Sequence, residues 1–215
     1  MKILILIFTI FLSNLCFAKT IEFENYKVVN LGYISISKNM EIQAGKYKQI
    51  SEAYQKEIGK RFGYEISSDR VVFQQKRLNN LEKKGFSSYA RVILETDIGN
   101  YGDYKKLTTH YTATQKELKQ WNEIQAEMQL FFPQVGLKLI SWQGTSIEKI
   151  NGRTALKVSY IRQLNNNPYV WVDMYQFQNN DRLHRLTLSY RLSDEKIWKP
   201  LFSQVSKSFF ITNVR

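Results

Sequence analysis

The residues best suited to bind a ligand are two aromatic side chains and a carboxylate that alternate along one predicted strand. Trp171, Asp173 and Tyr175 stand two positions apart, and side chains two positions apart on a strand share one face of the sheet. Lys157 and Arg185, on the neighbouring predicted strands, add positive charge. Aromatic rings beside cations and a carboxylate can stack on a sugar or an aromatic ring and hydrogen-bond to its polar edge. These five residues are the candidate ligand-binding face.

The same pattern also has a structural explanation. A helix expected over residues 47–62 could cover this face, and Trp171 and Tyr175 would then form a second layer of the core. Both interpretations remain open, and we favour the covered face.

Strand register decides which residues share that face. A two-residue or four-residue loop around 179–181 would place Asp173 among the leucines of the next strand, whereas a three-residue loop would place it opposite Thr187 and near Arg185. An unpaired buried carboxylate costs several kcal/mol. We therefore predict the three-residue loop.

A three-residue loop over 165–167 leads to the same assignment of faces for the preceding pair of strands. It places Val158 opposite Met174 and Tyr160 opposite Val172. The predicted core face comprises Leu156, Val158, Tyr160, Val170, Val172, Met174, Leu186, Leu188 and Tyr190. The predicted opposite face comprises Lys157, Ser159, Trp171, Asp173, Tyr175, Arg185, Thr187 and Arg191.

Common catalytic motifs are absent from the sequence. His110 and His184 stand in unrelated contexts, so they build no zinc-binding helix, and we interpret His184 as a residue at a strand end. The sequence contains no nucleophile elbow, glycine-rich phosphate loop or dinucleotide fingerprint. A hydrolase that uses a carboxylate pair such as Glu95 and Asp97 remains an alternative, because sequence cannot show two acids facing one cleft. We expect a protein that is not an enzyme and that holds no cofactor.

One loop has the composition of a cation site. Asp97, Asn100 and Asp103 could supply oxygen ligands, but their spacing is not that of a calcium-binding EF-hand loop. The same residue types are typical of ordinary turns. We expect a surface loop and no metal.

The first eighteen residues resemble a secretory signal peptide. Lys2 is basic, residues 3–12 are almost entirely apolar, and Cys16 and Ala18 are small residues at the positions that a signal peptidase recognises. The apolar run is about half of the roughly 20 residues that a membrane span needs. We therefore expect cleavage after Ala18, a single mature domain over 19–215 with no transmembrane segment and no disulfide, and a periplasmic or secreted location.

The chain is basic, with a formal net charge of +12 at pH 7. Outside the cytoplasm this charge favours an anionic lipid, an acidic glycan or an envelope protein as partner, and not nucleic acid. We favour a solvated basic surface without a specific partner as the explanation of this charge.

The elements that position these residues follow from hydrophobic periodicity. Short alternating stretches predict strands at 33–37, 71–75 and 89–96, and turn signals divide 137–191 into a four-stranded antiparallel meander. Apolar residues at helical spacing predict the helix over 47–62 and another over 114–132. Pro200 indicates the start of a closing helix. The predicted fold class is α+β, an antiparallel sheet covered by helices.

This order resembles the PsbP-like superfamily of small exported α/β sandwich proteins, which includes the DcrB-like bacterial proteins. The resemblance rests on three stretches: Ile34-Ser35-Ile36-Ser37, the Asn151-Gly152-Arg153 turn before Ala155-Leu156-Lys157-Val158, and 198–209 with its Ser208-Phe209 ending. It implies the sandwich fold. The family's best-known member is an accessory subunit of the photosynthetic oxygen-evolving complex, and the resemblance carries over no functional residue.

Together these features predict an exported, non-catalytic accessory or binding protein of the bacterial cell envelope. The alternatives are the carboxylate-pair hydrolase and a basic module that binds an anionic membrane surface or glycan.

Overall fold

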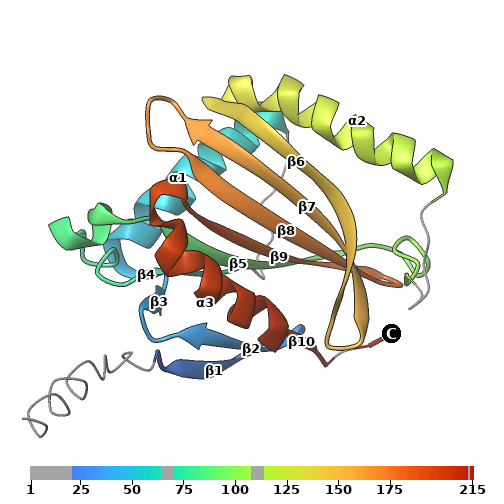
Figure 1. Ribbon diagram of the computed structural model, residues 1–215, viewed down its shortest axis with the longest axis horizontal. Coiled ribbons are helices and arrows are strands. Elements are labelled where there is room, and N and C mark those ends of the chain that lie inside the picture. Colours follow the sequence, from blue (N-terminus) through green and yellow to red (C-terminus); the bar gives the residue numbers. More distant parts are fainter. Residues whose placement is uncertain (1–20, 64–69, 108–113, 213) are drawn as a thin grey trace, which may run out of the picture.

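The computed structural model describes residues 21–63, 70–107, 114–212 and 214–215, and within these ranges the chain forms two antiparallel sheets with helices on them (Figure 1). In spatial order, the seven strands described in the larger sheet are β3 (Met40–Ile42), β4 (Val71–Gln75), β5 (Ala90–Ile98), β9 (Arg182–Arg191), β8 (Val170–Asn179), β7 (Arg153–Leu164) and β6 (Leu137–Ile150). The smaller sheet contains β1 (Phe23–Val28), β2 (Gly32–Ser37) and β10 (Phe210–Ile211).

The helices are α1 (Gly45–Phe62), α2 (Gln115–Phe131) and α3 (Glu195–Ser208), with short 3-10 turns η1 (Lys83–Ser87), η2 (Phe132–Val135) and η3 (Leu192–Asp194). The predicted α+β class is confirmed. None of the helices in the described ranges is long and apolar enough to span a bilayer. The predicted signal peptide and His110 lie outside the described residues.

The larger sheet is covered on both faces. In Figure 1, α3 lies in front of this sheet and α1 passes behind it. The main core lies on the α3 face and is built from the small sheet, α3 and residues such as Val92, Leu186 and Leu188. A second core on the α1 face contains Phe132, Val158, Tyr160, Val170 and Val172.

Local signals place the first two helices where the sequence predicts them. α1 ends at Gly63, whose φ of 72° is the left-handed conformation that glycine adopts without strain. α2 begins at a complete capping box, in which the Thr114 side chain accepts a hydrogen bond from the Glu117 backbone and the Glu117 side chain accepts one from the Thr114 backbone.

The third helix corrects one expectation. α3 begins at Glu195 and runs through Pro200, so the proline does not mark a new helix start. A proline inside a helix removes one backbone hydrogen bond and costs about 3 kcal/mol. Burial of Trp198, Leu201 and Phe202 against the sheet offsets this cost.

The register between β7 and β8 is the predicted one. Val158 lies opposite Met174, and Tyr160 lies opposite Val172. The six residues of the predicted core face that come from these two strands share the α1 face of the sheet.

The register between β8 and β9 differs from the prediction by one residue. Asn179 pairs with Arg182, which leaves a two-residue loop of Asn180 and Asp181, and Asn180 adopts the φ of 61° that such a turn needs. Asp173 therefore lies opposite Leu188.

This slip moves every side chain of β9 to the other face. Leu186, Leu188 and Tyr190 join the α3 face, and Arg185, Thr187 and Arg191 join the α1 face. Asp173 is tolerated among the β9 leucines because its carboxylate is paired: Lys157 Nζ lies 3.7 Å from Oδ1, and the Ser159 hydroxyl donates to the same oxygen at 2.5 Å.

Candidate functional site

The structure separates the five residues of the candidate ligand-binding face. Strand pairing places Lys157, Trp171, Asp173 and Tyr175 together on the α3 face. It places Arg185 on the α1 face, so its assignment to this group is wrong. The binding role of the other four residues stays a prediction.

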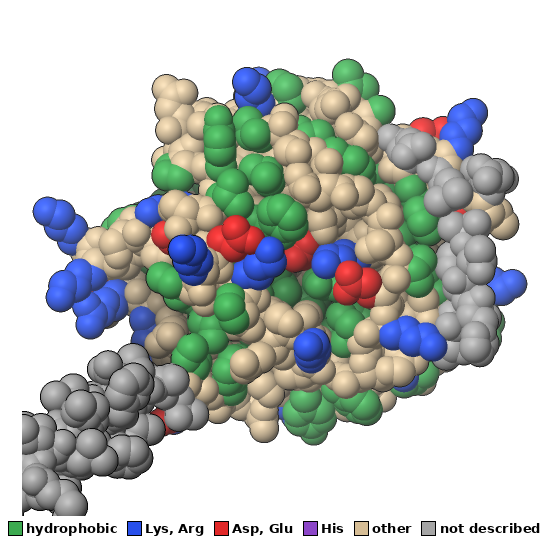
Figure 2. All heavy atoms as spheres, viewed as in Figure 1, with side chains coloured by type: hydrophobic (Ala, Val, Ile, Leu, Met, Phe, Trp, Pro, Cys, Tyr) green, Lys and Arg blue, Asp and Glu red, His purple; other side chains and the backbone are tan. Residues whose placement is uncertain are grey.

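The polar groups on the α3 face are already paired with one another. Lys157 Nζ lies 3.0 Å from Glu148 Oε1, 3.7 Å from Asp173 Oδ1 and 5.3 Å from the centre of the Tyr175 ring. Burial alone would lower the pKa of Lys157, but Asp173, Tyr175 and Glu148 together raise it. Figure 2 shows acidic and basic side chains alternating in a row across the middle of this side of the molecule.

The aromatic members of this group belong mainly to the core. Tyr175 is buried, and Trp171 packs against the main core with Lys199 Nζ of α3 5.9 Å from its ring centre. The covering helix is therefore α3 and not the predicted helix over 47–62. With its rings packed and its charges paired, this face has few groups left to hold a ligand.

The carboxylates considered for catalysis lie in ion pairs. Glu95 Oε1 lies 3.0 Å from Arg70 Nε and Glu95 Oε2 lies 3.8 Å from Arg185 Nε, and Asp97 Oδ2 lies 2.7 Å from Arg185 Nη2. Asp173 is paired with Lys157. Each of these carboxylates is balanced by a basic side chain. The arrangement does not place two carboxyl groups across a cleft from each other, as a hydrolase with a carboxylate pair requires.

The loop with the composition of a cation site is held by its own hydrogen bonds. The Asn100 backbone N–H donates to Asp103 Oδ2 at 2.6 Å, and Asp97 is occupied by Arg185. In the described ranges, no group of three or more His, Cys, Asp or Glu side chains could hold a metal ion.

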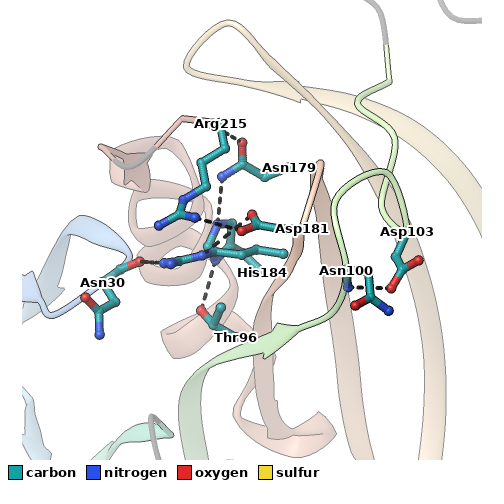
Figure 3. A network of polar contacts seen from close by, with 9 residues as sticks. Asn30, Thr96, Asn100, Asp103, Asn179, Asp181, His184 and Arg215 are labelled. Atoms are coloured by element: carbon teal, nitrogen blue, oxygen red, sulfur yellow. Dashed lines mark hydrogen bonds and ion pairs between the residues drawn. The ribbon is translucent and has the colours of Figure 1, made fainter.

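His184 is a buried neutral side chain (Figure 3). Asn179 Oδ1 accepts from the Arg215 backbone N–H, which orients the Asn179 amide to donate to His184 Nε2 at 3.2 Å. Nδ1 therefore carries the proton and donates to Thr96 Oγ1 at 2.9 Å. Burial, with Arg182 and Arg153 nearby, lowers the pKa of His184 to about 4. These contacts assign the side chain a structural role.

A cavity of about 570 Å³ lies on the other face of the sheet, between α1, η2 and the strands. Tyr47, Ile50, Tyr54 and Ile58 border it from α1, and Ile93, Tyr160 and Val172 are among the residues that border it from the sheet. Its volume lies in the range of small-molecule sites, and its walls are mainly apolar.

The polar part of the cavity wall includes two arginines, Arg91 and Arg162. Arg91 Nη2 donates to the Tyr47 hydroxyl at 2.6 Å, and the Arg91 guanidinium lies over the Tyr47 and Tyr89 rings, 5.6 and 5.4 Å from their centres. Arg162 Nη2 donates to the Tyr89 hydroxyl at 3.3 Å. Tyr89 thus links the two guanidiniums from behind the cavity wall.

The electrostatic potential around this cluster is positive. Burial alone would raise the pKa of Tyr89, but Arg91 and Arg162 lower it to about 8. A phenol acquires such a pKa where positive charge stabilises its phenolate form.

The sequence contains a signal for this site. A helical stripe such as Ile50, Tyr54 and Ile58 usually packs in a core, yet Ile50 and Tyr54 remain 58% and 50% exposed. On β5, Arg91 and Ile93 alternate as a cation and an apolar residue on one face. Only the fold shows that this face and the helical stripe border the same cavity.

No family model matches the sequence, and comparison with curated proteins gives no significant match. Among solved structures, the chain is similar to the cyanobacterial PsbP protein CyanoP of Synechocystis sp. PCC 6803, with 12% identity, a TM-score of 0.46, and coverage of 91% of this chain and 95% of that one. A protein of unknown function from Pseudomonas aeruginosa, PA94, has 11% identity and a TM-score of 0.44 over 90% and 99% of the two chains. A protein of Bacteroides thetaiotaomicron VPI-5482 has 8% identity and a TM-score of 0.43 over 84% and 45%.

Proposed function

We propose that this protein is an exported, non-catalytic binding protein of the bacterial cell envelope, and that its binding site is the cavity beneath α1. The observation that carries the proposal is the cavity itself: about 570 Å³, mainly apolar and bordered by a helix whose apolar side chains stay half exposed. An apolar space with a few convergent polar groups is the usual form of a small-molecule site.

The polar chemistry of the described residues supports binding over catalysis. Glu95, Asp97 and Asp173 are held by basic partners, and His184 is enclosed by hydrogen bonds. The cavity wall contains arginines, tyrosines and aliphatic residues, which favour recognition of a bound molecule.

The proposal is tested with Nile red, a neutral apolar dye that fluoresces strongly when it leaves water. We expect the wild-type protein to bind the dye and Ile93→Trp, which fills the cavity, to bind it at least about tenfold more weakly. The matched control is Ile98→Trp, on the same strand at a position that is 68% exposed.

Thermal unfolding of both variants shows whether they keep the fold. Absence of dye binding by the wild-type protein, or equal binding by folded Ile93→Trp and Ile98→Trp, would contradict the proposed site.

A further inference from the structure

The cavity beneath α1 differs from the neighbouring cluster around Glu95 in how its cations are balanced. On the same face, Arg70 and Arg185 pair with Glu95, and Arg185 pairs also with Asp97. Buried or half-buried guanidiniums usually have such partners, because an unpaired charge loses much of its hydration without compensation.

The two cavity arginines have phenols as neighbours where carboxylates would be expected. Among the residues that the structure describes, no Asp or Glu oxygen lies within 4 Å of the Arg91 or Arg162 nitrogens. Their hydrogen bonds go to the hydroxyls of Tyr47 and Tyr89. Neutral phenols accept these hydrogen bonds but do not neutralise two positive charges.

Arg91 also retains a hydrogen-bond donor without a partner. Its Nε is buried and has no hydrogen-bond acceptor among the residues that the structure describes. A buried donor left without an acceptor loses the free energy of its hydrogen bonds to water. A ligand oxygen that reached this guanidinium would recover that energy and supply the missing negative charge.

The remaining walls suit a hydrocarbon. Ile58, Ile93 and Val172 face the cavity from α1 and the sheet, and Phe131 and Phe132 border it at the end of α2 and in η2. Half-exposed Ile50 and Tyr54 on α1 would lose further apolar surface on contact with a bound chain.

We propose that the cavity binds an amphipathic carboxylate, with the carboxylate held by Arg91 and Arg162 and the hydrocarbon chain lying between α1 and the sheet. This assignment rests on the proposed binding function and specifies the ligand class. The planar guanidinium groups match a carboxylate in both charge and geometry.

The test compares two ligands with the same chain and different head groups, decanoate and decan-1-ol, by isothermal titration calorimetry at neutral pH. We expect the wild-type protein to bind decanoate at least about tenfold more tightly than decan-1-ol, because a charge-assisted hydrogen bond contributes more than a neutral one. Arg91→Met and Arg162→Met should each remove most of that preference while retaining decan-1-ol binding.

Arg185→Met is the matched control. It removes an equal charge from the same sheet face without altering the cavity wall, so it should leave the preference for decanoate unchanged. Retained decan-1-ol binding also shows that a variant is folded.

The outcomes separate this inference from the proposed function. Equal wild-type affinity for the two ligands overturns the carboxylate assignment and leaves the apolar binding site standing, and this measurement needs no variant to fold. A preference for decanoate that survives folded Arg91→Met and Arg162→Met overturns the role of the arginines. Binding of neither ligand contradicts both proposals.

Discussion

At the scale of single residues, the neighbours of a charged group decide its role. Asp173 lies among apolar side chains of β9, but Lys157 and Ser159 on β7 stabilise it as part of the structure. Arg91 and Arg162 donate hydrogen bonds to tyrosine hydroxyls, and in the proposed site their charges bind a ligand carboxylate. The five-residue candidate face thus divides into a self-paired cluster on the α3 face and Arg185 on the other.

His184 gives a residue-scale prediction about stability in acid. Its pKa is about 4 in the folded protein, below the ordinary value of 6.5. Between these two pH values, the histidine therefore binds a proton more readily in the unfolded chain than in the folded one. The free energy of unfolding should be highest above about pH 6.5 and fall by up to about 3 kcal/mol as the pH approaches about 4.

Chemical denaturation of the wild-type protein and His184→Gln at about pH 7 and about pH 4.5 measures this contribution. Glutamine can replace both hydrogen bonds but does not titrate, so the variant should lose less stability between the two pH values than the wild-type protein. Equal losses would show that protonation of this histidine does not destabilise the fold.

At the scale of elements, α1 and α3 cover the two faces of one sheet in different ways. α3 buries Trp198, Leu201, Phe202 and Val205, whereas only Gly59 of α1 is buried. A helix with little buried surface opens more easily than one fixed in the core. α1 is therefore the element whose stability a ligand in the cavity can change most.

Hydrogen–deuterium exchange tests this difference. We expect the amides of α1 to exchange faster than those of α3 in the free protein, and saturating decanoate to slow exchange in α1 by about tenfold or more while leaving α3 nearly unchanged. A ligand that protected α3 and not α1 would place the binding site on the other face of the sheet.

At the scale of the whole molecule, the prediction concerns export. Residues 1–18 lie outside the described part of the chain, and their role as a cleaved signal peptide stays a prediction from the sequence. When the full chain is expressed in a Gram-negative bacterium, we expect a periplasmic protein whose first residue is Lys19, as measured by fractionation and intact mass.

Ala18→Asp should block this cleavage, because the peptidase accepts only small uncharged side chains at that position. Ala44→Asp, within the mature chain, is the control and should leave processing unchanged. A full-length wild-type protein that stays in the cytoplasm would contradict the export proposal.

Local features of the sequence determined the elements themselves. Gly63 ends α1 and the Thr114–Glu117 capping box begins α2, because caps and left-handed glycines act within a few residues along the chain. The β7–β8 pairing was also predictable, since a three-residue loop over 165–167 sets Val158 opposite Met174 and Tyr160 opposite Val172.

Only the tertiary structure decided the site. The apolar residues of β9 pack in the main core, whereas β7 and β8 supply apolar residues to both faces of the sheet. Because β9 can meet apolar residues on either face, the alternation of apolar and polar residues does not distinguish a two-residue from a three-residue loop. The choice depended on Lys157 and Ser159, which compensate Asp173 from a neighbouring strand. The cavity likewise depends on how closely α1 approaches the sheet, and this distance is set by packing between residues far apart in sequence.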